Sequence, residues 1–181
     1  FSAGWRVYEE HFYGENLKKT INSLKISGGS GQLGNQNIGN FQYLSTIGYS
    51  GGYGYNLGTG NVLQSGAVVT GLANPNITWE KAVMTNISME LATLNNHLTA
   101  VVTYFNKNTT DMLVPFQLVE TFGAQTNLPD DGGNITLPNQ NIGTLNNHGV
   151  EIELNYQNKA GKLNYSFGAN GYFIRNKVTK L

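Results

Sequence analysis

The stretch Val150–Phe173, VEIELNYQNKAGKLNYSFGANGYF, decides the fold class of this chain. In its first part apolar and polar residues alternate one by one, in the order Val150, Glu151, Ile152, Glu153, Leu154, Asn155 and Tyr156. A period of two is typical of a β-strand whose two faces meet different surroundings. The alternation resumes after Gly161, with Leu163, Tyr165, Phe167 and Ala169 on one face and Asn164, Ser166, Gly168 and Asn170 on the other. The stretch therefore predicts a β-hairpin.

The register of this hairpin depends on where its turn lies. A two-residue loop at Lys159–Ala160 places Leu154 opposite Tyr165 and Glu153 opposite Ser166. Both faces then stay chemically uniform, as the register of a hairpin requires. We predict this register.

A second hairpin is predicted over residues 79–105. The dipeptide Asn95–Asn96 tolerates positive φ and predicts a tight turn. With Leu94 opposite His97, the apolar residues of the first strand meet apolar residues of the second. Two apolar residues interrupt the polar side, namely Val101 and Phe105.

The connections between the predicted strands are unequal in length. With residues 23–29 and the strand end at residues 1–7, the chain has about six spans, most near the ~9–11 residues of a membrane-crossing strand. The links at 95–96 and 159–160 are short and the link at 9–20 is of middling length. The loops at about 32–78 and 113–141 are long. This asymmetry favours an antiparallel transmembrane β-barrel with short periplasmic turns and long extracellular loops, and it is unusual for a compact soluble domain.

Composition excludes several other classes. The 181 residues carry 11 Lys and Arg against 11 Asp and Glu, which argues against a nucleic-acid binder. The absence of Cys excludes a disulfide framework and thiolate metal sites. No apolar run approaches the ~18 residues of a transmembrane helix, and the start of the chain has no signal-peptide pattern. The 23 Gly and 25 Asn suit strands and turns.

The alternation assigns side chains to two faces of the predicted wall. The lipid-facing set is Val83, Ile87, Met89, Leu91, Val150, Ile152, Leu154, Leu163 and Phe167. The set expected to face the lumen or a substrate is Asn86, Ser88, Glu90, Glu151, Glu153, Asn155, Asn164, Ser166 and Asn170. Trp79, Tyr156, Tyr165 and Phe173 fall near predicted strand ends and fit interfacial aromatic girdles.

Other motifs have simpler explanations than a catalytic or cofactor site. Residues 29–34, GSGQLG, match the dinucleotide fingerprint, but no helix pattern follows. The Asp130–Gly133 run lacks the ligand spacing of a calcium loop, and the three His residues fit no metal-ligand spacing. The Glu residues alternate with apolar residues and are read as lumen-lining groups. We therefore expect no cofactor, no metal and no enzymatic activity.

A glycine-rich segment at residues 48–60 carries three interleaved tyrosines, namely Tyr49, Tyr53 and Tyr55. Aromatic faces bind sugars, but such loops are common. We read these tyrosines as candidates for contact with a lid protein or neighbouring loops, and direct ligand contact stays open.

Several ordered motifs resemble those of SusC/RagA-type TonB-linked transporters. They are residues 1–10 (FSAGWRVYEE), 21–25 (INSLK), 31–40 (GQLGNQNIGN), 74–81 (NPNITWEK), 104–107 (YFNK) with 110–113 (TDML), and 140–143 (QNIG) with Asn155–Tyr156. The resemblance covers nearly the whole chain. It implies an internal segment of a 22-stranded barrel, without the plug domain, the TonB box or the final strand of the family.

The resemblance also implies a function. Family members import oligosaccharides or peptides across the outer membrane of Gram-negative bacteria, energised by the TonB complex and assisted by a SusD/RagB-like surface lipoprotein. We expect the segment alone neither to close nor to transport, because six strands leave two unpaired edges. The alternatives are a secreted β-sandwich, such as a glycan-binding module or adhesin, and an extracellular β-fold hydrolase.

Overall fold

The structure is a computed structural model that describes residues 1–56, 58–60, 62–117 and 135–181, with the backbone only at residues 50–53, 55 and 63. Strands make up most of it. The chain divides into two compact units, which are described separately. Unit 1 comprises residues 1–34, 81–109 and 144–180, and unit 2 comprises residues 35–80, 110–143 and 181.

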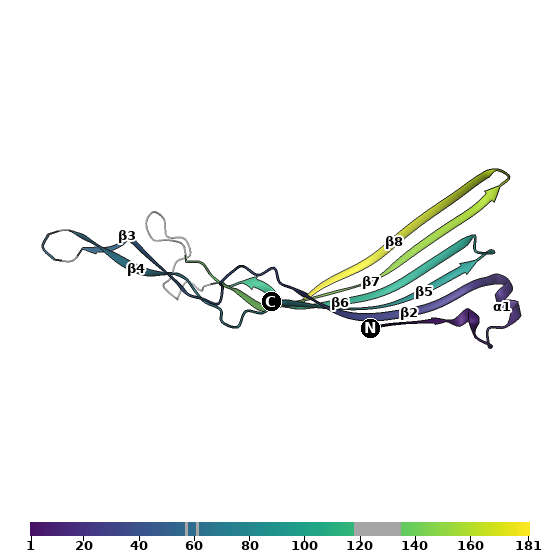
Figure 1. Cartoon of the computed structure of the whole chain (residues 1–181), viewed down its shortest axis with the longest axis horizontal. Helices are drawn as coiled ribbons and strands as arrows, with labels where there is room; N and C mark the ends of the chain where they lie inside the picture. Colours follow the sequence, from purple (N-terminus) through teal and green to yellow (C-terminus); the bar gives the residue numbers. More distant parts are fainter. Residues whose placement is uncertain (57, 61, 118–134) are drawn as a thin grey trace. The chain divides into compact units, whose positions relative to one another are not determined.

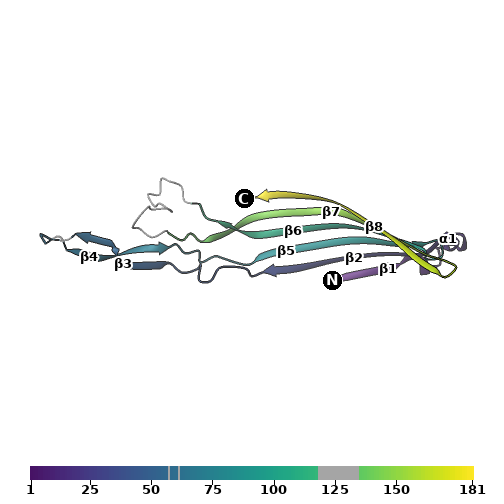
Figure 2. The same cartoon turned by 90° about the horizontal axis from the view of Figure 1, so that it is seen from above.

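Six strands form one antiparallel sheet (Figures 1 and 2). In sequence order they are β1 (Ser2–Arg6), β2 (Ile21–Asn35), β5 (Glu80–Thr93), β6 (Leu98–Pro115), β7 (Asn139–Ala160) and β8 (Leu163–Lys180). They also follow this order across the sheet, so each strand pairs with its predecessor in the sheet. The predicted six antiparallel strands are therefore confirmed. The sheet is open, with β1 and β8 at its edges.

The two short turns illustrate how local sequence sets the register. At residues 94–97 the His97 amide donates to the Leu94 carbonyl at 3.1 Å, and Asn95 and Asn96 have φ of 57° and 66°. Two central residues with positive φ define a type I′ turn, which matches the twist of the flanking strands. The predicted turn at Asn95–Asn96 is confirmed.

The turn between β7 and β8 lies two residues later than predicted. Ala160 pairs with Leu163, so the loop residues are Gly161 and Lys162, and Gly161 has φ of 63°. Glycine at the first loop position adopts positive φ without steric cost, which Lys159 would not. Leu154 therefore lies opposite Ala169 rather than Tyr165. The partner of each residue shifts by four positions, an even number, so the face assignment is unchanged.

The left-handed conformation of the first turn gives a stability prediction. Replacing Asn96 with alanine is expected to lower the free energy of unfolding by about 1 kcal/mol, because alanine adopts positive φ at a cost that asparagine largely avoids. Urea unfolding of the protein that carries this chain measures the change. Asn96→Gly is the matched control and is expected to be neutral or mildly stabilising; an equal loss in both variants would contradict the turn geometry.

The link between β1 and β2 contains two buried apolar side chains. It consists of the 3₁₀ helix η1 (Val7–Glu9), a short segment and the helix α1 (Glu15–Thr20). Val7 and Tyr13 are buried there, and the Tyr8 and Tyr13 rings lie 5.6 Å apart. No helix in the described part of the chain is long and apolar enough to cross a bilayer.

Unit 2 holds a second sheet within the first long connection. Strands β3 (Thr46–Asn56) and β4 (Leu63–Gly71) pair antiparallel, with a register shift between Ser50 and Tyr55. The interpretation of residues 48–60 as a loop is therefore wrong for residues 48–56, which lie in β3, where Tyr49 pairs with Ala67 and Tyr55 with Gln64 of β4. The connections between sheet strands span residues 36–79 and 116–138.

Candidate functional site

Contacts across unit 1 fix which side chains share a face of the sheet. Lys25 on β2 contacts Glu90 on β5 at 2.9 Å. Ser88 on β5 lies 2.9 Å from Thr103 on β6. The Gln157 amide on β7 donates to the carbonyl of His97, one residue before β6, at 2.8 Å. These contacts, with the β1–β2 and β7–β8 registers, identify which residues lie opposite one another on neighbouring strands. Because every second residue of a strand points to the same face, each face of the sheet consists of rows of neighbouring side chains that cross all six strands.

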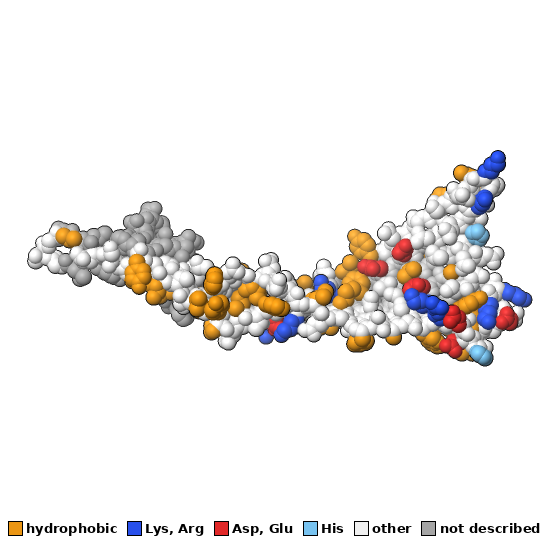
Figure 3. Space-filling model, viewed as in Figure 1, with side chains coloured by type: hydrophobic (Ala, Val, Ile, Leu, Met, Phe, Trp, Pro, Cys, Tyr) orange, Lys and Arg blue, Asp and Glu red, His pale blue; other side chains and the backbone are white. Residues whose placement is uncertain are grey.

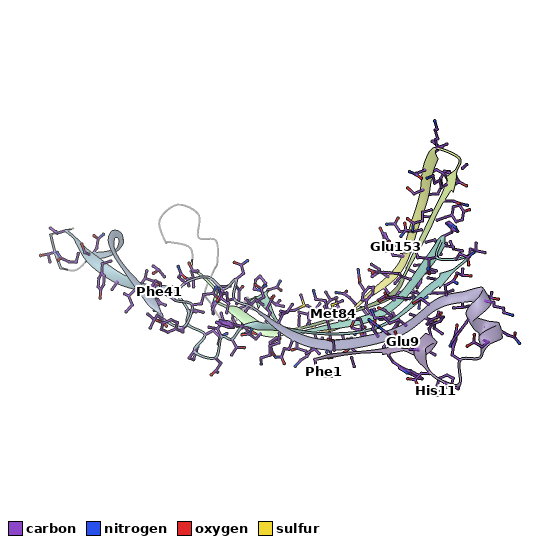
Figure 4. The ribbon with its side chains drawn as sticks, turned by 45° about the vertical axis from the view of Figure 1, so that its right-hand side comes forward. Phe1, Glu9, His11, Phe41, Met84 and Glu153 are labelled. Carbon is purple, nitrogen blue, oxygen red and sulfur yellow. The ribbon has the colours of Figure 1, made fainter. Side chains whose placement is uncertain are left out.

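One face, called the polar face here, carries every residue of the predicted lumen-facing set. Glu151 and Glu153 line a hollow of about 280 Å³ together with Asn170 from β8. The Asn155 amide donates to Glu153 at 2.7 Å, and Asn164 and Ser166 continue the same face on β8. In Figure 4, Glu153 lies on the same side of the unit 1 ribbon as Met84 and opposite to Phe1.

The polar face also holds residues that the sequence analysis did not select. Lys25 forms the ion pair with Glu90, Thr103 bonds Ser88, and Tyr172 lies directly opposite Glu151. The signal for Lys25 was present, because it alternates with Leu24 and Ile26 on β2. Phe105 on β6 also lies on this face, and its ring packs against Gly149 on β7. This contact explains why an aromatic residue interrupts the polar side.

The Lys25–Glu90 ion pair is expected to contribute little to stability. The two side chains are 40% and 44% exposed, so water screens their attraction. A double-mutant cycle with Lys25→Ala and Glu90→Ala should give a coupling energy of about 0.2–1 kcal/mol. Urea unfolding of the four proteins provides the measurement. A coupling above this range would show that water is largely excluded from the pair.

The opposite face, called the apolar face here, carries the predicted lipid-facing set. Its central three rows form what we call the apolar band. They are Leu24, Leu91, Ala100, Leu154 and Ala169; then Trp5, Ile26, Met89, Val102, Ile152 and Gly171; then Ala3, Gly28, Ile87, Tyr104, Val150 and Phe173. Together with an edge row containing Leu98, Tyr156 and Phe167, these rows extend about 20 Å along the strands. A membrane barrel shows an outer apolar band of about 25 Å.

The apolar band is uncovered in the described structure. Ile152 is 45% exposed, Leu154 is 43% exposed and Phe167 is 69% exposed. A β-sandwich would bury these side chains against a second sheet about 10 Å away. Among its described residues, unit 1 contains one sheet and no second sheet that covers this face.

Aromatic rings lie at both ends of the apolar band. At the turn end Tyr165 lies 6.3 Å from Tyr156 and 5.8 Å from Phe167, measured between ring centroids. At the other end Tyr104 and Phe173 occupy the last apolar row. This placement fits interfacial girdles for Tyr156, Tyr165 and Phe173. Trp79 belongs to unit 2 and lies outside the band.

Several residues of the predicted sets lie outside the apolar band. Val83 shares the apolar face but lies two rows beyond the band, and Leu163 lies beside the Gly161–Lys162 turn. Tyr49 is exposed on β3, whereas the side chains of Tyr53 and Tyr55 lie outside the described residues. The Asp130–Gly133 run also lies outside them.

The Asn-Ile-Gly motif at residues 141–143 holds together the base of the long connections in unit 2. The Asn141 amide donates to the carbonyls of Thr78 and Asp111, both at 2.7 Å, and its oxygen accepts from the Thr78 amide at 2.8 Å. Glu80 accepts from the Leu113 amide at 2.9 Å. The motif residues that carry the family resemblance therefore have a structural role at this junction.

Replacing Asn141 with alanine is expected to destabilise the junction by about 2 kcal/mol, since each lost hydrogen bond contributes about 0.5–1.5 kcal/mol. Urea unfolding and protease sensitivity of the long connections measure the effect. Asn147→Ala on the same strand is the matched control, because no hydrogen bond of the Asn147 side chain occurs among the described residues. Equal effects at the two positions would rule out the junction role.

The remaining motifs take no part in a chemical site. The glycines at 29–34 lie inside β2, in extended strand rather than before a helix. His97 is a turn residue, as predicted, with its Nδ1 2.7 Å from the Gln157 carbonyl. Within the described ranges, no three His, Asp or Glu side chains gather closely enough to hold a metal ion.

A single-layer antiparallel sheet with one apolar and one polar face defines a segment of a β-barrel wall. The chain belongs to the TonB dependent receptor-like, beta-barrel family, whose family model matches residues 20–179. It is 27% identical over 157 residues to TonB-dependent receptor P26 of Formosa agariphila, covering 87% of this chain. It is 28% identical to TonB-dependent receptor SusC of Bacteroides thetaiotaomicron, covering 99% of this chain. The resemblance stated from the motifs is confirmed.

The chain spans 14% to 17% of the length of the curated relatives that it matches. Among solved structures, the RagAB peptide transporter superposes with a TM-score of 0.74 at 23% identity, over 99% of this chain and 18% of that chain. The same transporter in its open-open state gives the same TM-score at 22% identity. These two likenesses establish the fold.

Proposed function

We propose that this chain is part of the wall of a TonB-dependent importer in the outer membrane of a Gram-negative bacterium. The observation that supports this proposal is the uncovered apolar band on one face of the sheet, opposite a face lined with carboxylates, amides and hydroxyls. In this arrangement the apolar face meets outer-membrane lipids and the polar face lines the lumen. The short turns lie at the periplasmic end and the long connections at the outer end.

The imported solute is an oligosaccharide or a peptide, and a SusD/RagB-like surface lipoprotein covers the outer end. The resemblance to SusC/RagA-type transporters implies both substrate classes, and one structural neighbour is described as a peptide transporter. Amides, hydroxyls and carboxylates on the polar face exchange hydrogen bonds with polar solutes of either class. Energy comes from the TonB complex through parts of the receptor outside this chain. No enzymatic step is part of this function.

Adjacent residues on β7 test the orientation of the wall. Single cysteines at Ile152 and Glu153 of the whole receptor are labelled with a small fluorophore, which is practical because this chain contributes no Cys of its own. In outer-membrane vesicles, the label at 152 should be quenched by nitroxide-bearing lipids and the label at 153 by aqueous iodide. The reverse pattern, or iodide quenching at both positions, would refute the orientation.

Uptake by cells that lack the receptor tests the transport function. Fluorescent oligosaccharides and oligopeptides are offered to wild-type cells, to receptor-deletion cells and to cells that lack TonB. Uptake of one solute class should fall to background in both mutants and return on complementation. Unchanged uptake of both classes in the deletion strain would overturn the proposal, and loss of one class identifies the substrate.

A further inference from the structure

The apolar band ends at the same row on β2, β5, β6, β7 and β8. Beyond the row of Tyr104 and Phe173, the apolar face continues with two rows that are almost entirely polar. They are Ser30, Thr85, Asn106, His148 and Arg175, and then Gln32, Val83, Asn108, Asn146 and Lys177. The boundary separates an apolar surface from one that can bind ions.

Five side chains from β6, β7 and β8 form a patch in these rows. We name it the basic patch: Asn106, Asn146, His148, Arg175 and Lys177. Arg175 pairs directly with His148 across the β7–β8 ladder, and Lys177 pairs with Asn146. Because the partners of an antiparallel pair point to the same face, all four side chains leave the sheet on one side.

Hydrogen bonds already order the neutral members of the basic patch. The Asn146 amide donates to the Asn106 oxygen at 2.7 Å. The His148 Nδ1 lies 2.8 Å from the Asn146 oxygen, which makes this nitrogen the donor. The second ring nitrogen of His148 is then left for a ligand or water.

The two cations of the basic patch have no acidic partner among the described residues. Both side chains are exposed, and neither forms an ion pair there. The Arg175 guanidinium carbon lies 5.5 Å from the centre of the Phe173 ring, the last aromatic residue of the apolar band. The described part of the two rows carries no Asp or Glu to oppose a bound anion. Elsewhere in unit 1 the charged side chains seen in Figure 3 include both signs.

We propose that the basic patch binds the phosphate of an outer-leaflet lipid head group whose acyl chains lie along the apolar band. This inference rests on the proposed function, because it needs the apolar face to meet lipid. A guanidinium binds phosphate oxygens through two parallel N–H donors, and a neighbouring ammonium adds a second positive charge. The ligand is amphiphilic because the patch directly adjoins Tyr104, Val150 and Phe173. A soluble anion would leave those side chains uncovered.

Native mass spectrometry of the whole detergent-solubilised receptor, titrated with phosphorylated lipid A, tests the proposal. Removing both charges with Arg175→Gln and Lys177→Gln should weaken binding about 10–30-fold. Each basic residue near a membrane surface strengthens binding to anionic lipid by roughly the same factor, so the two losses multiply. Lys159→Gln with Lys162→Gln is the matched control. It removes two cations from the same hairpin at its turn end and should leave the affinity unchanged.

Two further arms identify the ligand chemistry. Lipid A treated with phosphatase should bind the native receptor as weakly as phosphorylated lipid A binds the double variant. Inorganic phosphate at millimolar concentration should displace little of the lipid. Equal binding of both lipids, equal losses in the two double variants, or full displacement by inorganic phosphate would each overturn the proposal. Heat-modifiable gel mobility reports barrel folding separately, so a failure of lipid binding is distinguishable from a failure of the proposed function.

Discussion

Replacing Ile152 with arginine is expected to destabilise the folded receptor in a bilayer by about 2–4 kcal/mol, the cost measured for a basic residue on the lipid face of a barrel near the membrane midplane. Ile152 lies in the middle row of the apolar band, between the aromatic residues at its two ends. Its side chain is not covered by protein in the described structure. Under the proposed function the arginine would meet acyl chains and could reach polar groups only by extending along its strand.

Two other positions make this expectation specific. Asn155→Arg on the polar face of the same strand should cost clearly less, because water surrounds the new charge there. Phe167→Arg lies in the edge row beside Tyr156, so its charge should cost about 0–1 kcal/mol, as near an interface. Urea titration of receptor refolding into vesicles gives the three free energies. Equal penalties at Ile152 and Asn155 would contradict the assignment of the two faces.

The faces of the sheet were predictable from the sequence because side-chain direction depends only on a period of two. The wrong position of the β7–β8 turn did not change the assignment of residues to faces. Moving the loop from Lys159–Ala160 to Gly161–Lys162 shifts the partner of each residue by four positions, which is an even number. The rows were not predictable in the same way. They depend on the register of every strand pair, and the relevant contacts, such as Lys25 with Glu90, join residues 65 positions apart.

The limits of the apolar band depend on those rows. The sequence placed Val83 with Ile87 and Met89, because all three are odd-numbered apolar residues on one strand. In the structure Val83 lies in the row of Asn146 and Lys177, so the face becomes polar before the strand ends. Sequence alternation also missed β3 and β4, because the Gly48–Gly60 segment has too many glycines to give a strand pattern.

Among the glycines of the six-stranded sheet whose surroundings are described, Gly149 leaves the least room for a side chain. A Cβ added there would collide with the Phe173 carbonyl oxygen and would lie 3.1 Å from two atoms of the Phe105 ring. Neither group can move aside easily, because the Phe173 carbonyl belongs to the backbone of β8 and the Phe105 ring is packed across the β6–β7 pair. Gly149→Val should therefore cost about 1–3 kcal/mol from overpacking, and should separate β7 from β8 locally.

A second glycine of the same hairpin provides the control for Gly149→Val. Gly171 on β8 has no atom within 4 Å of an added Cβ, and it lies in the middle row of the apolar band beside Ile152. Gly171→Val adds the same side chain to an open position on the apolar face, and valine has the higher strand propensity. It should be neutral or stabilising. The folded fraction of each variant on unheated gels, followed by urea unfolding, separates the two outcomes. If both valines cost the same, the close packing of Phe105 on Gly149 does not exist in the folded wall.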